Sequence, residues 1–205
     1  METPQPQGIF EQSFKHKMWS NSIRLGLVLY AALVFATYFL DRSWALLTFS
    51  KALGGTAALL IGSSFALSGF CYYWNFLDTK IGYRKYLGLT GYWFAVVYSV
   101  SLLFVNPDRY FFGFFDNLIS PDFILGLSAM ALFTFMALIS NNTAMMKLGP
   151  QNWRRALRVG YFAWFLLALR AYFIEREIWV VWLNTGEGFP PPRLLLSLMV
   201  VAIIL

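Results

Sequence analysis

The feature that most constrains this chain is a series of five apolar runs, each long enough to cross a lipid bilayer. A transmembrane helix needs about 17–25 such residues to span roughly 30 Å of hydrocarbon. In lipid, backbone N–H and C=O groups must be paired within the segment, which favours helices. The sequence therefore predicts an all-α integral membrane protein with five full transmembrane helices. The runs cover residues 23–40, 54–77, 86–105, 123–139 and 157–173.

A sixth apolar run, 194–205, has only twelve residues. As an α-helix it would rise about 18 Å, which is too short to span the bilayer alone. We expect a short C-terminal hydrophobic helix here. Residues 1–21 form a polar segment before the first run, and the whole chain, 1–205, is expected to be one transmembrane domain.

The composition agrees with a membrane protein and excludes other classes. Hydrophobic residues make up 59% of the chain and charged residues 13%, whereas soluble domains average about 45–50% and 25%. The net charge of +6 is divided among the loops and forms no basic stripe, so no nucleic-acid partner is expected. The lipid bilayer is the expected environment.

The basic residues also predict the orientation of the chain. Ten Lys and Arg residues fall on the side of the N-terminus and six on the opposite side. Cytoplasmic loops carry the excess of Lys and Arg, so the N-terminus is predicted to be cytoplasmic. The same side carries the loops around Arg84 and Arg154.

The second run is rich in small residues at helical spacing. Gly55, Gly62 and Gly69 recur every seven residues, and Gly62 forms a small-x-x-x-small pair with Ala66. Small residues let helix backbones approach closely in lipid, so these four are predicted to pack against another helix. The alternative is a groove that accepts the edge of a lipid, a quinone or a porphyrin.

Residues suited to catalysis or metal binding are scarce. The single histidine, His16, lies between Lys15 and Lys17 and is expected to be solvated. No cluster of His, Cys, Asp and Glu has the spacing of a metal site, and no nucleotide-binding motif occurs. We therefore predict no catalytic residue and no metal site.

Arg170 is the ionisable residue inside a span that most needs an explanation, since such residues are often functional. It lies near the predicted outer end of the fifth run. Its guanidinium group could reach water along its own alkyl stem. Alternatively, it could pair within the bundle with Glu175, Asp41 or Asp122.

Two longer outer segments are predicted to lie at the membrane interface. Residues 106–122 carry several Phe and Tyr residues between two prolines, and 171–193 contains Trp179 and Trp182. These tryptophans are three apart and would share one face if the segment is helical. Aromatic side chains of this kind anchor segments at the headgroup level.

Two stretches resemble a known family. GYRKYLGLTGYWFAVVYSVSLLF (82–104) resembles the R-R-x-L-G-L-x-x-F-x-Y segment of the ferric reductase-like transmembrane domain. SNNTAMMKLGPQNWRRALRVGYFAWFLLALRAYF (140–173) resembles that family's S-x-x-x-M-x-x-x-L-G-x-x-W-x-x-L-H-R-x-x-Y segment. The family includes the short bacterial haem-binding membrane subunits of methionine sulfoxide reductase systems. The matching residues in the second stretch are Leu148, Gly149, Trp153, Arg154, Arg158 and Tyr161.

The resemblance implies a helical bundle in the bacterial inner membrane that holds haem b between histidines of the third and fifth spans. In this chain the corresponding positions are Tyr98, Leu157 and Arg170. No histidine follows His16, so the resemblance carries the fold but not the haem ligands. No haem and no other cofactor are expected.

The resulting interpretation is a non-catalytic scaffold or accessory subunit of a membrane complex, with another membrane or periplasmic subunit as its partner. One alternative is an oxidoreductase subunit for electron transfer that binds haem b or a quinone. Another is a carrier of a lipid or small molecule, although the broken, charged helices expected at a mid-membrane site are missing.

Overall fold

The computed structural model describes residues 7–42, 44–73 and 82–186, and every regular element in these ranges is helical. The sixth apolar run, 194–205, lies outside the described residues. The elements in chain order are α1 (Gln7–Asp41), α2 (Leu46–Tyr73), α3 (Tyr83–Val105), the π-helix η2 (Asp108–Phe112), α4 (Phe114–Asn117), α5 (Pro121–Ile139), α6 (Asn142–Leu148), α7 (Pro150–Leu157) and α8 (Val159–Thr185).

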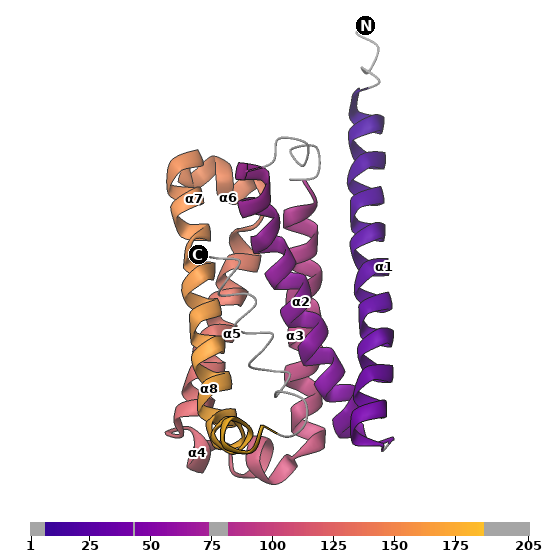
Figure 1. Cartoon of the computed structure of the whole chain (residues 1–205). Helices are drawn as coiled ribbons and strands as arrows, with labels where there is room; N and C mark the ends of the chain where they lie inside the picture. Colours follow the sequence, from indigo (N-terminus) through magenta and orange to yellow (C-terminus); the bar gives the residue numbers. More distant parts are fainter. Residues whose placement is uncertain (1–6, 43, 74–81, 187–205) are drawn as a thin grey trace, which may run out of the picture.

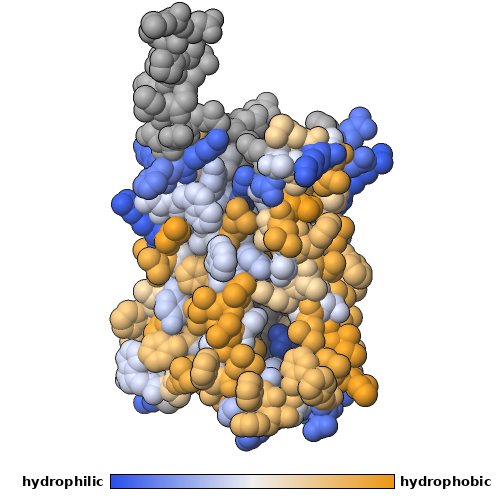
Figure 2. Space-filling view, turned by 180° about the vertical axis from the view of Figure 1, so that it is seen from behind, coloured by the Kyte–Doolittle hydropathy of each residue, from blue (hydrophilic) through white to orange (hydrophobic). Residues whose placement is uncertain are grey.

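Five helical stretches in the described chain are long and apolar enough to cross a membrane. They lie side by side along one direction, with α6 and α7 at one end of the bundle and α4 at the other (Figure 1). On the face seen in Figure 2, the surface between the two ends is largely hydrophobic, and most strongly hydrophilic side chains gather at the ends. The prediction of a helical integral membrane protein with five spans is confirmed.

Two helices begin well before the predicted spans, because the helical backbone continues beyond the apolar runs. The first helix starts at Gln7, well before the predicted span at 23–40. The second starts at Leu46, eight residues before the predicted position. Residues 46–53 are apolar except for Thr48, Ser50 and Lys51, and a single half-buried lysine does not end a helix.

The fifth predicted span, 157–173, is interrupted at its start and extended at its end. A short helix, α7, ends at Leu157, and α8 then continues to Thr185. In Figure 1 the last turns of α8 are seen end-on near α4, so they run across the bundle direction. The rings of Trp179 and Trp182 pack edge to face with centroids 5.9 Å apart. This arrangement suits the interfacial anchor predicted for the segment.

The core joins the two halves of the bundle. Within the first half α2 packs closely against α3 and α1, and within the second α5 packs against α8. Six buried residues connect the halves, and they come in pairs from α2, α5 and α8: Ile61, Phe65, Ala129, Phe133, Ala163 and Trp164. These side chains pack against one another where the two halves meet.

Helices α2 and α3 lie close together at Gly91. A Cβ atom at this position would lie 3.0 Å from the backbone nitrogen of Ile61 and 2.8 Å from its Cγ1. One turn earlier, Gly88 faces Ser64, whose hydroxyl oxygen would be 3.1 Å from an added Cβ. Small residues on the third helix therefore allow the two backbones to meet.

Candidate functional site

A cavity of about 740 Å³ opens at the end of the bundle that carries α6 and α7. Its walls come from α1, α2, α3, α5, α7 and α8, and its size lies in the range of about 300–1,000 Å³ that is typical of ligand pockets. Seven of its lining residues are aromatic: Phe14, Phe65, Tyr86, Tyr92, Phe133, Trp153 and Tyr161.

Hydrogen bonds between helices hold the walls of this cavity. Ser64 on α2 donates to the backbone carbonyl of Arg84 at 2.8 Å, which fixes the start of α3. The Tyr92 hydroxyl donates to Thr134 on α5 at 3.2 Å. The Trp153 indole N–H donates to the carbonyl of Ile139 at 2.9 Å, which ties α7 to the end of α5.

The cavity has a polar mouth and an apolar interior. Four cationic side chains line it, from Lys15, Arg84, Lys85 and Arg158, and no described lining residue is acidic. Lys15, Lys85 and Arg158 are exposed, whereas Ile61, Phe65 and Phe133 are buried. The charged side chains therefore lie on the exposed part of the lining, and these apolar side chains lie on its buried part.

The three positions at which the resemblance would put haem ligands contact different parts of the bundle. Tyr98 packs its ring against Gly54 on α2, whose added Cβ would lie 3.2 Å from the ring. Leu157 lines the cavity. Arg170 lies against α5, with its Nε donating to the backbone carbonyl of Asp122 at 3.0 Å.

These side chains do not fit a haem. A leucine side chain has no lone pair, and a guanidinium group is always protonated in proteins and cannot donate a lone pair to iron. In this structure the Arg170 guanidinium also has a structural contact of its own. Only Tyr98 carries an oxygen that could bind iron, and a single tyrosine leaves the second axial position without a protein ligand.

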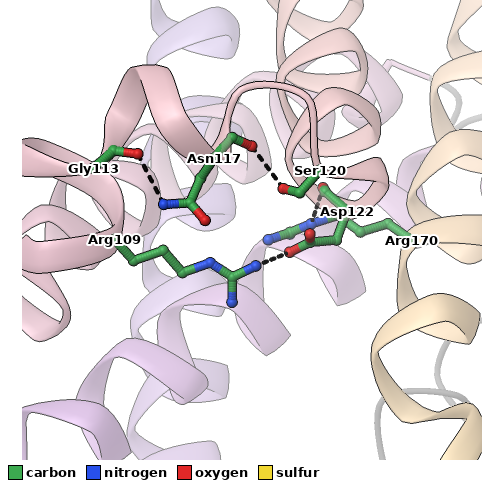
Figure 3. Close-up of polar contacts among 6 residues, drawn as sticks. All are labelled: Arg109, Gly113, Asn117, Ser120, Asp122 and Arg170. Atoms are coloured by element: carbon green, nitrogen blue, oxygen red, sulfur yellow. Dashed lines mark hydrogen bonds and ion pairs between the residues drawn. The ribbon is translucent and has the colours of Figure 1, made fainter.

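Arg170 belongs to a polar cluster with Arg109, Asn117, Ser120 and Asp122 (Figure 3). This cluster lies near η2, α4 and the start of α5, at the opposite end of the bundle from α6 and α7 (Figure 1). Arg109 on η2 forms an ion pair with the carboxylate of Asp122 at 2.7 Å. Arg170 approaches the same residue from α8 and binds its backbone carbonyl. Of the alternatives considered for Arg170, the structure shows a bond within the bundle to Asp122, through the main chain rather than the carboxylate.

The glycine series on α2 is placed as follows. A Cβ added to Gly55 would lie 3.0 Å from Leu33 Cδ1 on α1. Gly62 and Ala66 are buried, and the surroundings of Gly69 lie outside the described residues. Whether these residues are needed for assembly stays a prediction.

His16 is exposed on α1, and the described residues hold no group of three or more His, Cys, Asp or Glu able to bind a metal.

Neither the close packing at Gly88 and Gly91 nor the cavity at the α6–α7 end was predicted from the sequence. The glycines could have been found from the spacing G-L-T-G in the third run, which places both on one helix face. The cavity could not, because its cations come from three segments far apart in the chain.

Comparison with protein-family models and with curated proteins gives no match for this chain.

Proposed function

We propose that this chain is a non-catalytic membrane subunit with a ferric reductase-like helical bundle, which supports another membrane or periplasmic component. The proposal rests on the hydrogen bond that Arg170 makes to Asp122. At a position where the family has a haem-binding histidine, this residue joins α8 to α5 through the carbonyl of Asp122. The position therefore has a role in holding the bundle together.

We also propose the orientation that the sequence predicts. The N-terminal end of α1 lies at the same end of the bundle as α6 and α7 (Figure 1). Arg84, Lys85, Lys147 and Arg158 belong to helix ends on this side. By the positive-inside rule this end would face the cytoplasm of a bacterium, with the protein in the inner membrane.

The second candidate is a membrane electron-transfer subunit that binds haem b or a quinone. The aromatic lining of the cavity favours it, since flat conjugated rings pack well on aromatic side chains. Against it, Tyr98, the one position with a possible ligand oxygen, packs on Gly54 of α2 and is not among the residues lining the cavity.

Complementation separates the two functions. Deleting this chain from its source cell should lower the membrane level of the supported component, measured by quantitative proteomics. Wild type and Tyr98→Phe should restore that level equally, because a scaffold needs the ring and not the hydroxyl. A Tyr98→Phe chain that folds normally but fails to complement would favour the electron-transfer candidate.

A further inference from the structure

We propose that the cavity at the α6–α7 end binds the headgroup of one anionic phospholipid, with the upper part of its acyl chains against the apolar interior. This site is independent of the scaffold role, because it uses none of the contacts of Arg170 or Asp122.

The first argument is charge. Lys15 from α1, Arg84 and Lys85 from α3, and Arg158 from the α7–α8 junction all line the cavity. Like charges gathered at one opening raise the free energy of the bundle, and a bound anion removes that cost.

The second argument is the position of α3. This helix begins at Tyr83, beside the cavity, with no side-chain cap and no acidic residue in its first turn. The positive end of its dipole therefore adds to the field of the four cations. Phosphate oxygens accept hydrogen bonds from both backbone amides and guanidinium groups.

The third argument is the apolar interior, which decides the class of anion. Ile61, Phe65 and Phe133 are buried at the wall of the cavity. A small phosphate compound would not cover the apolar wall of the cavity, and a neutral quinone would bring no negative charge to Arg84, Lys85 and Arg158. An anionic amphiphile can contact both the apolar wall and the cations.

The fourth argument is depth in the membrane. Arg84 and Lys85 lie in the first turn of α3 and Arg158 at the α7–α8 junction. Lys15 lies in the first turn of the hydrophobic stretch that begins at Phe14 within α1. This is the level of lipid phosphates, and basic pockets between transmembrane helices are known to bind anionic headgroups such as cardiolipin.

The test is native mass spectrometry of the full chain, purified in a mild detergent and supplied with phosphatidylglycerol or phosphatidylcholine of the same acyl chains. We expect about one retained phosphatidylglycerol per chain and little phosphatidylcholine. The triple variant Arg84→Gln, Lys85→Gln, Arg158→Gln should weaken retention at least about tenfold. The matched control is Lys147→Gln with Arg155→Gln, which removes exposed cations at the same end that do not line the cavity.

A second pair of variants keeps the charges and changes only the space. Ala137 on α5 lines the cavity, whereas Ala131 on the same helix is exposed and does not. Ala137→Phe should reduce lipid retention and Ala131→Phe should not. If the triple variant fails to fold, the comparison of Ala137→Phe with Ala131→Phe still tests whether the lipid binds in the cavity.

Three results would overturn the proposal. Equal retention of the two lipids would show that headgroup charge is not recognised. Equal retention by Ala137→Phe and Ala131→Phe would place the lipid elsewhere. Displacement of phosphatidylglycerol by glycerol phosphate at a similar concentration would assign the site to a soluble phosphate compound.

Discussion

Arg170 on α8 donates its Nε–H to the backbone carbonyl of Asp122 at the start of α5, over 3.0 Å. The guanidinium group also lies on Gly126, where an added Cβ would come within 3.1 Å of the same Nε. A glycine one turn after Asp122 thus makes room for the arginine. The pair joins two helices near the end of the membrane-spanning region, where an unpaired cation would be costly.

Arg170→Met should therefore destabilise the protein, by about 1–3 kcal/mol, because it removes a charged donor from a partly buried carbonyl. Asp122→Asn should cost less, within about 1 kcal/mol, since the main-chain carbonyl remains and only the partly exposed ion pair with Arg109 is lost. Thermal unfolding in detergent measures both. An unchanged melting temperature for Arg170→Met would indicate that the side chain only reaches toward water.

The contact of α2 with α3 gives a second prediction. Gly91→Ala should lower folded yield and melting temperature, because its Cβ would meet the backbone nitrogen of Ile61 at 3.0 Å. Gly54→Ala is the matched control. Its Cβ would meet only the ring of Tyr98, at 3.2 Å, and a ring can rotate slightly where a helix backbone cannot. Equal effects of the two substitutions would contradict the close packing at Gly91.

The fold class followed from the apolar runs because burial in lipid leaves helices as the only open choice for such segments. The helices are longer than the predicted spans, since they continue into polar residues at their ends. This is why α1 and α2 begin early and α8 ends late. Hydropathy measures the apolar core of a helix and not its hydrogen-bonded length.

The site was predicted only in part, for a different reason. Tyr98, Leu157 and Arg170 were singled out by position in a motif, and the sequence could not show that they lie apart. The bond of Arg170 to Asp122 joins residues 48 positions apart. Its acceptor is a backbone carbonyl, which every residue has, so no side-chain pattern could reveal it. Asp122 was named as a candidate partner for its carboxylate.

Gly149 gives a third prediction, this time from backbone conformation. It ends α6 with φ 74° and ψ 153°, a region that is essentially restricted to glycine. No heavy atom lies within 4 Å of an added Cβ, so space is available and only the backbone is strained. Gly149→Ala should destabilise by about 1–3 kcal/mol, read as a shift in thermal unfolding. An unchanged melting temperature would argue against this turn.

The topology is tested by labelling. Lys147 is exposed on α6, and α6 lies at the end proposed to be cytoplasmic. With Cys71 replaced by Ser, a Lys147→Cys chain in intact cells should resist a membrane-impermeant thiol reagent and react after lysis. An exposed control at the opposite end, Asp116→Cys, should react in intact cells. Labelling of Lys147→Cys from outside would reverse the orientation.

The most direct measurement is the haem content of the purified chain, produced in cells supplied with a haem precursor. The absorption spectrum and a pyridine haemochrome assay give the amount of haem per chain. Because Leu157 cannot ligate iron and Arg170 is engaged with Asp122, we predict haem far below one per chain and no Soret band that survives purification. A stoichiometric b-type spectrum would contradict the scaffold account and establish a haem-binding membrane subunit instead.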